Sequence, residues 1–224
     1  TGLQAADVVI CSVYPAATLD FVKSAVPFLK SDVLITDATG IKGSLPEDVQ
    51  RLLTGRMEFI AGHPMAGRQG SGLGMSQAEI FDGANYIVVP AAFNSSGAIE
   101  WLSRFAGAIG CGQVVQVDAV EHDRIIAYTS NLPHALAVAL INSASYNENT
   151  KYFIAGSFRD GTRVADINPY LWSDLFLANR ENVLQEVAAF SQQLERWRKA
   201  LTAADAQALQ EMMREAAVKR KDLY

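Results

Sequence analysis

The sequence predicts an α/β protein in which an incomplete, doubly wound sheet is followed by an all-helical domain. Short apolar strands alternate with helices over residues 1–117, which is the pattern of a mostly parallel sheet covered on both faces. From Asp118 onward the apolar residues recur only at helical spacing. We therefore expect two domains, 1–117 and 118–224.

Five strands are predicted in the first domain. The first, 8–13, is a continuous apolar run of the kind that is buried on both faces of a sheet. The others are expected at 33–36, 58–62, 86–89 and 113–117. Ligands of doubly wound sheets bind beyond the carboxyl ends of the strands. We therefore expect a site at the strand ends that carry Ser12–Tyr14, Asp37–Gly40 and His63.

Helices are predicted between these strands, over 16–30, 44–53 and 96–109. Ser44 and Glu47 have the spacing of a capping box, in which each side chain bonds a free backbone N–H of the first turn. Pro46 suits that first turn because its missing N–H is not needed there.

Three helices are predicted in the second domain, over 119–145, 169–200 and 203–220, with Thr202 as the N-cap of the last. The stretch 132–141 is apolar on nearly all sides, so it must be buried on most of them. A domain this small offers little surface to cover it. We therefore expect the second domain to form a homodimer.

The composition argues against several classes of function. The net charge is −5 and the one basic cluster is Lys219–Lys221, so a nucleic-acid partner is not expected. Cys11 and Cys111 have no cysteine or histidine at the spacing of metal ligands, so no metal site is predicted. Both are expected to be reduced thiols of a cytoplasmic protein. No apolar run reaches the length of a membrane span, so no membrane association is expected.

The glycine-rich stretches do not supply a dinucleotide-binding turn. Gly70–Gly74 and Gly107–Gly112 both depart from the G-x-G-x-x-G spacing, and neither joins a strand to a helix, so both are predicted to be turns. The chain also enters its first apolar strand almost at once. We therefore expect it to open within a domain whose first part precedes Thr1.

Two histidines are candidates for chemistry. His63 follows a strand at the ligand-binding edge, where position alone leaves a functional and a structural role equally open. His134 lies three residues after Asn131 on one helix face, and by itself it indicates a buried, hydrogen-bonded histidine at a helix kink near Pro133. His122, by contrast, is expected to be solvated or to pair with neighbouring acids.

Arg159 and Arg163 lie four residues apart in a predicted loop. Arginine binds carboxylates through two parallel hydrogen bonds, so the pair could hold an acidic ligand. Ion pairs with Asp160 or Asp166 are an equally good interpretation.

Three motifs, taken in order, resemble those of the prephenate/arogenate dehydrogenases. The first is Gly62–Gly67 followed by Ser71 and Gly72, the second is Ser130–His134 after His122 and Asp123, and the third is Phe158–Arg163 followed by Pro169, Trp172 and Asn179. The resemblance extends over nearly the whole chain. The order and spacing of the three motifs are more specific than any one of them.

The resemblance implies a Rossmann-like nucleotide-binding domain, a helical dimerisation domain and an enzyme of tyrosine biosynthesis. Such an enzyme uses NAD or NADP to oxidise prephenate or arogenate at the ring carbon that carries the hydroxyl. Loss of carbon dioxide then aromatises the ring and gives 4-hydroxyphenylpyruvate or tyrosine. The residues leave both substrates and both cofactors open.

The resemblance also implies roles for single residues. His63 corresponds to the catalytic histidine, which accepts the proton of the ring hydroxyl, and His134 to a second histidine of the pocket. Arg163 corresponds to the arginine that binds a substrate carboxylate. The remaining substrate-binding assignments are Asn131, Thr39 and Gly40. Position at the strand and helix ends gives the cofactor-binding assignments, which are Ser12, Val13, Pro15, Thr18 and Asp37. Gly40 stands where the family often has a serine, and Asn131 where a histidine is common.

The family's glycine-rich turn and the acidic residue that selects NAD or NADP would precede Thr1. We therefore expect the 224-residue chain alone to bind a dinucleotide poorly and to show little or no dehydrogenase activity. Two alternatives remain open. One is a non-catalytic dimeric remnant that binds an aromatic compound or a partner, and the other is a different hydroxyacid dehydrogenase of the same architecture.

Overall fold

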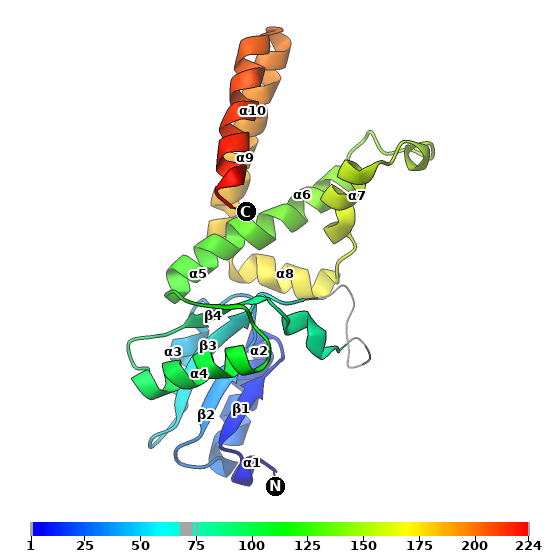
Figure 1. The fold of residues 1–224 in the computed structure, drawn as a ribbon. Helices are drawn as coiled ribbons and strands as arrows, with labels where there is room; N and C mark the ends of the chain where they lie inside the picture. The colour runs from blue at the N-terminus through cyan, green and yellow to red at the C-terminus, as the bar shows by residue number, and fades with distance from the viewer. Residues whose placement is uncertain (1, 68–73, 75, 224) are drawn as a thin grey trace. The chain divides into compact units, whose positions relative to one another are not determined.

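A computed structural model describes residues 2–67, 74 and 76–223. The chain forms two compact units, Thr1–Asn182 and Val183–Tyr224. The first unit contains the sheet with its covering helices and the helical segments up to α8, and the second contains most of α9 and all of α10 (Figure 1).

The first unit is built on a five-stranded sheet whose order follows the chain. Neighbouring strands are parallel except for β3 and β4, which are antiparallel. The strands are β1(Val8–Cys11), β2(Leu34–Asp37), β3(Glu58–Pro64), β4(Asn85–Val89) and β5(Gln113–Gln116). This confirms the predicted α/β sheet.

One expectation about β1 is wrong. It is an edge strand with a single described neighbour, β2, and its burial pattern shows that it is not buried on both faces. Cys11 is buried, whereas Ile10 is 45% exposed. The strand also ends at Cys11, two residues before the predicted end.

Helices cover both faces of the sheet, which makes it doubly wound (Figure 1). Alternate residues of β3 show the two faces: Phe59 packs in one core cluster with Val22 of α2(Pro15–Ala25) and Val49 of α3(Leu45–Gln50). Ile60 packs in a second cluster with Leu102 of α4(Ser96–Ala108). A short helix, α1(Gly2–Ala5), precedes β1, and a 3₁₀ turn, Val26–Phe28, follows α2.

The predicted capping box of α3 does not form. Ser44 occupies the N-cap position but makes no side-chain cap, and its hydroxyl donates to the Asp48 carboxylate at 2.6 Å instead. The backbone of Ser44 is not extended, with φ −93° and ψ 2°, so its side chain does not point back to the free N–H groups. Ser95 and Asp118 do cap α4 and α5, each accepting a backbone N–H.

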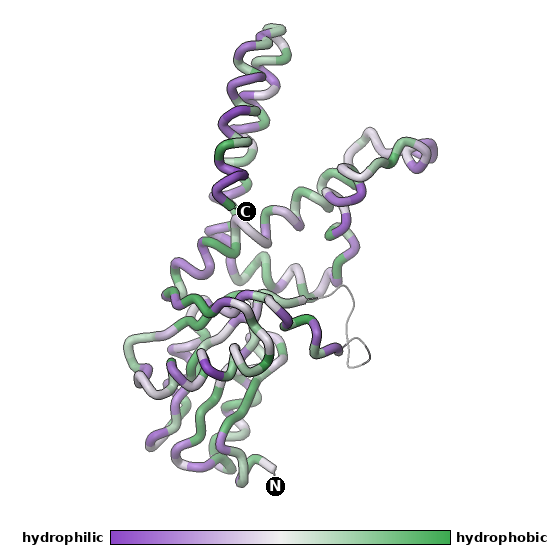
Figure 2. The backbone as a smooth tube through the Cα atoms, viewed as in Figure 1, coloured by the Kyte–Doolittle hydropathy of each residue, from purple (hydrophilic) through white to green (hydrophobic). Residues whose placement is uncertain are grey.

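The predicted helix over 119–145 is interrupted in the middle. It consists of α5(Ala119–Ile126), a π-helical turn Ala127–Asn131 and α6(Leu132–Ile141). Pro133 gives a physical reason, because it has no N–H for the carbonyl of Thr129 and its ring crowds that carbonyl. Such π turns are frequent at functional sites. Most of α6 is apolar (Figure 2), with Pro133 and His134 as exceptions, and Leu140 on it is 48% exposed.

The segment that follows contains two further departures from the sequence prediction. Residues 158–163, predicted as a loop, lie in α7(Gly156–Thr162) and the 3₁₀ turn Arg163–Ala165. The predicted helix over 169–200 breaks at Asn179, which has non-helical φ −111° and ψ 23°. The break separates α8(Pro169–Ala178), capped by Asn168, from α9(Arg180–Thr202).

The second unit is a helical hairpin of α9 and α10(Ala206–Lys221). Arg196 and Glu215 pair across it at 3.5 Å. The N-cap of α10 is Asp205, which accepts from the Ala208 N–H, and the prediction of Thr202 is wrong. Thr202 still belongs to α9, where its hydroxyl donates to the Arg198 carbonyl. No helix in the described residues is long and apolar enough to cross a membrane.

Candidate functional site

A buried ion pair underlies the carboxyl ends of β2 and β3. Asp37 ends β2, and Lys42 follows it after a short loop; both side chains are fully buried. The Lys42 ammonium donates to the Asp37 carboxylate at 2.7 Å and to the Gly62 carbonyl at 2.6 Å. Asp37 also accepts the N–H groups of Gly62 and Thr39. These bonds fasten the loop 37–42 to β3 next to His63.

The Lys42 and Asp37 charges satisfy each other in a region without water access. Burial lowers the pKa of Lys42, and the Asp37 carboxylate opposes that shift. Removing one member of such a pair leaves an uncompensated buried charge, which costs roughly 3–5 kcal/mol. The pair therefore specifies the position of the loop, because few other arrangements could satisfy both groups.

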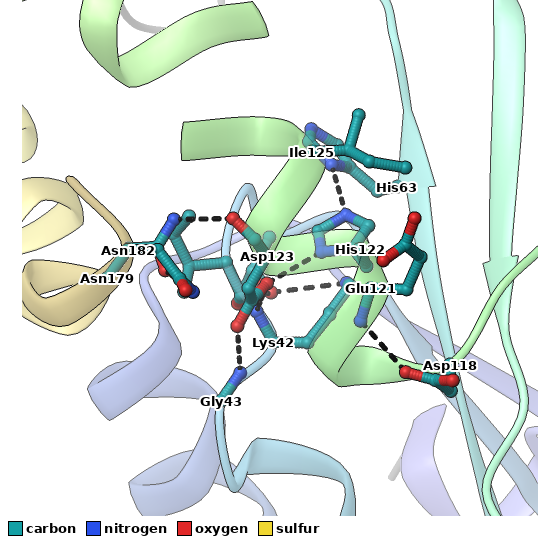
Figure 3. A network of polar contacts seen from close by, with 12 residues as sticks. Lys42, Gly43, His63, Asp118, Glu121, His122, Asp123, Ile125, Asn179 and Asn182 are labelled. Carbon is teal, nitrogen blue, oxygen red and sulfur yellow. Dashed lines mark hydrogen bonds and ion pairs between the residues drawn. The ribbon is translucent and has the colours of Figure 1, made fainter. Parts of the chain in front are cut away.

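His63 lies near the end of β3, with one ring nitrogen hydrogen-bonded and the other facing Gly40. Its Nδ1 lies 2.9 Å from Nε2 of His122 (Figure 3). A Cβ placed on Gly40 would be 4.0 Å from His63 Nε2 and 3.6 Å from Leu175 Cδ2. Burial, the Lys42 cation and His122 together lower the pKa of His63 to about 3, so its imidazole is neutral at physiological pH.

His122 and Asp123 form the other end of this network. His122 Nδ1 lies 2.6 Å from the Asp123 carboxylate, which also accepts the backbone N–H groups of Lys42 and Gly43 at 2.9 and 2.7 Å (Figure 3). Of the two expectations for His122, pairing with a neighbouring acid is confirmed by Asp123, whereas a solvated side chain is wrong because His122 is buried. The signal was its position four residues before the apolar Ile126, on the face of α5 that packs inward.

A cavity of about 570 Å³ opens beyond the carboxyl ends of β1 and β2. It lies within the first unit, and α8 closes one side of it through Leu171 and Leu175. The other lining residues are Ser12, Val13, Tyr14, Pro15, Ala17, Ala38, Thr39 and Gly40. Five of them were expected from the sequence to bind cofactor or substrate: Ser12, Val13, Pro15, Thr39 and Gly40. The volume lies in the usual range for small-molecule sites.

Two of the expected cofactor-binding side chains do not face this cavity. Thr18 and Asp37 have no exposed surface and do not line it. Thr18 faces inward from α2, and Asp37 is held by Lys42 as described above. Both were expected on the basis of strand and helix ends, but the side chain of a strand's last residue points to either face of the sheet. These two residues therefore belong to the buried packing next to the cavity and not to its lining.

A second polar group gathers around α8. His134 donates from Nδ1 to the Ser130 carbonyl at 2.8 Å, and its ring stacks on that of Trp172, with centroids 3.7 Å apart. Burial and the charge of Arg163 lower the pKa of His134. Trp172 lies on the same helix as Leu171 and Leu175, so α8 connects this group with the cavity.

Asn131, expected to bind substrate, is held in a buried amide cluster. Its side-chain oxygen accepts from Asn179 Nδ2 at 3.0 Å, and the same Nδ2 donates to the Asp123 carbonyl at 2.8 Å. Asn131 is 1% exposed, so its side chain braces α8 against the π turn and does not face a ligand. The expectation came from a family position alone and took no account of the break at Asn179.

Two further predictions concern metals and glycines. No group of three or more potential ligands that could hold a metal ion occurs among the described residues. The stretch Gly70–Gly74, predicted to be a turn, and the Ser71-Gly72 motif lie largely outside the described part of the chain.

The chain matches known proteins over almost its full length. Residues 1–115 match the family model for the prephenate dehydrogenase nucleotide-binding domain, and residues 118–215 match the model for its dimerization domain. A prephenate dehydrogenase of Lactococcus lactis is 31% identical over 96% of this chain. A cyclohexadienyl dehydrogenase of Zymomonas mobilis is 33% identical over 96% of this chain and 74% of its own length.

Solved structures give the same result. A crystal structure of prephenate dehydrogenase from A. aeolicus, in complex with hydroxyphenyl propionate and NAD+, superposes with a TM-score of 0.85 and 28% identity. The match covers 97% of this chain and 77% of that one, whereas the chain spans only 60% of the length of the Lactococcus relative. The two family models, met in order along the sequence, confirm the resemblance of the motifs, and the chain belongs to the prephenate dehydrogenase family.

Proposed function

We propose that the protein oxidises and decarboxylates prephenate or arogenate with NAD or NADP, giving 4-hydroxyphenylpyruvate or tyrosine. The observation that carries this proposal is the His63 imidazole, which is bonded through Nδ1 to His122 and has its Nε2 next to Gly40, a residue that lines the cavity beyond the strand ends. The relatives named prephenate and cyclohexadienyl dehydrogenase support the substrate class.

The cavity fits the nicotinamide end of a dinucleotide. It lies where doubly wound sheets bind nucleotides, and its lining is largely apolar, which suits a flat ring. Bound there, the cofactor would accept a hydride from the substrate. The turn between β1 and α2, residues 12–14, contains no glycine, so it does not offer the close approach that a pyrophosphate needs. Our proposal therefore assigns this turn to the nicotinamide side alone.

His63 would act as the proton acceptor. Its Nε2 lone pair takes the proton of the ring hydroxyl while the hydride leaves the same carbon, and the C–O bond becomes a carbonyl. The electron pair of the bond to the carboxylate then passes into the ring, carbon dioxide leaves, and the oxygen regains a proton. A neutral imidazole is required for the first step, and burial beside Lys42 keeps it neutral.

Arg163 and His134 would hold the substrate side chain. Arginine suits a carboxylate, and the charge of Arg163 already acts on His134.

We also propose a homodimer through the proposed domain 118–224, supported by the dimerization-domain match and by exposed apolar side chains such as Val120 and Leu177. Two free cysteines suit a reducing compartment, so a cytoplasmic location stays part of the proposal.

A non-catalytic protein that binds an aromatic compound is the second candidate, and the largely apolar lining of the cavity favours it. An assay at millimolar cofactor separates the two, because weak binding raises the cofactor concentration that is needed without removing the chemistry. We expect reduced cofactor to form with prephenate or arogenate, at a rate that rises with cofactor concentration. Binding of hydroxyphenyl propionate without any turnover would establish the non-catalytic alternative instead.

A further inference from the structure

Three buried or half-buried groups stand in line behind the reactive nitrogen of His63. His63 Nδ1 meets His122 Nε2 at 2.9 Å, and His122 Nδ1 meets the Asp123 carboxylate at 2.6 Å (Figure 3). Neither His122 nor Asp123 was among the predicted site residues. Their arrangement determines which ring nitrogens carry hydrogen.

The hydrogen positions follow from what each group can do. A carboxylate only accepts, so the His122 nitrogen that faces Asp123 must carry a hydrogen. A neutral His122 then has its lone pair on Nε2 and accepts from His63. His63 must therefore carry its hydrogen on Nδ1, which leaves the lone pair on Nε2, beside Gly40.

The far end of the line is held firmly. The backbone N–H groups of Lys42 and Gly43 donate to the Asp123 carboxylate, and Asn179 donates to the Asp123 carbonyl. The carboxylate cannot turn away from His122 without breaking these two backbone hydrogen bonds, one of which, from Lys42, is buried.

We propose that Asp123 and His122 are positioning residues that hold His63 in the tautomer with hydrogen on Nδ1, the one form able to accept a proton at Nε2. The catalytic consequence rests on the proposed function, whereas the tautomer is a property of the chain without substrate. When His63 gains a proton, its Nδ1–H stays bonded to His122, and the Asp123 carboxylate balances the charge through that ring.

The chain offers a simple test by ¹⁵N NMR, because it contains only three histidines. In the histidine-labelled chain, ring nitrogen shifts and couplings to ring protons identify the tautomer of each. We expect His63 in the Nδ1–H form at pH 7, although free histidine prefers Nε2–H. A His63 found in the Nε2–H form, or a doubly protonated His122, would overturn the proposal.

His134 is the internal control. A backbone carbonyl fixes its Nδ1–H independently of His122, so its tautomer should not change in any His122 variant. His122→Phe removes the acceptor, and His63 should then shift toward Nε2–H. His122→Gln keeps an oxygen that can accept from His63, and it should restore the Nδ1–H form.

Kinetics separate this proposal from the proposed function. Loss of a residue that orients a reacting histidine costs about 10- to 100-fold in activity. We expect that fall in kcat for His122→Phe, with KM nearly unchanged and partial recovery in His122→Gln. A wild-type chain with the expected tautomer but no turnover would refute the function and leave the positioning role standing. Normal kcat in His122→Phe, despite a changed tautomer, would refute the positioning role alone.

Discussion

His63 and His134 are both histidines with a lowered pKa, but the structure holds them in different ways. His63 is fixed by side chains that are themselves buried and bonded, from Lys42 to Asp123. His134 is fixed by a hydrogen bond to one backbone carbonyl and by stacking on Trp172, and Arg163, whose charge acts on it, is exposed. A reacting atom must be placed accurately, whereas a binding surface tolerates adjustment. We therefore expect substitutions around His63 to lower stability or kcat strongly, and substitutions around His134 to have smaller effects, mainly on KM.

The largest expected effect is on folding, from Lys42→Met. The substitution keeps the length of the side chain but leaves Asp37 charged, buried and without its ammonium partner. We expect a loss of about 3–5 kcal/mol in the free energy of unfolding, measured by urea denaturation. Lys30→Met is the matched control, because Lys30 pairs with Asp7 at the surface and should cost less than about 1 kcal/mol. Equal losses would show that the buried pair does not hold the site.

Arg163→Ala tests the substrate side of the comparison. A lost charge-assisted hydrogen bond to the substrate carboxylate costs about 1.5–3 kcal/mol of binding at an exposed side chain such as Arg163. We expect a higher KM for prephenate or arogenate with little change in kcat. Arg159→Ala removes the same charge one helical turn earlier and should leave KM unchanged. If both variants behave alike, Arg163 has only a structural role.

Gly62→Ala should disturb the base of the His63 site. An added Cβ would overlap Tyr86 Oη, at a distance of 2.4 Å, in a closely packed part of β3 and β4. Overpacking of this kind costs about 1–3 kcal/mol, measurable as a shift in the denaturation midpoint. Gly67→Ala is the control, since nothing lies within 4 Å of its Cβ position. A fully stable Gly62→Ala chain would mean that Tyr86 can move aside.

The smallest expected effect is on acid stability. Folding lowers the pKa of His63 from 6.5 to about 3, so below pH 6.5 the unfolded chain takes up a proton that the folded chain refuses. The stability that depends on a neutral His63 is complete above pH 6.5 and is lost as pH falls toward 3. The loss in the free energy of unfolding reaches about 2 kcal/mol at pH 5. Comparing His63→Asn with the wild type at pH 7 and 5 should reveal that difference. An identical pH dependence would show that His63 titrates normally.

Much of this fold follows from periodicity. The strand positions, the helices that cover the sheet and the edge that carries His63 were all predictable from apolar patterns and strand ends. The resemblance of three motifs also indicated His63 and Gly40, which the structure brings together.

Other features depend on contacts between distant residues and leave little trace in the sequence. Asn179 interrupts a helix because its side chain bonds Asp123 and Asn131, which lie far away in the chain. For His122 the expected pairing with a neighbouring acid is found in Asp123, but its second partner, His63, lies 59 residues away and could not be predicted from the local sequence. Buried polar networks of this kind are determined by tertiary structure and not by local propensity.

The turnover number of His63→Asn tests the central claim most directly. Asparagine can keep a hydrogen bond but cannot accept the proton. Circular dichroism and hydroxyphenyl propionate binding should remain those of the wild type. We expect kcat to fall by about 10²- to 10⁴-fold, the range of a lost general base. A near-normal kcat in a folded, ligand-binding variant would contradict the account and remove His63 from the chemistry.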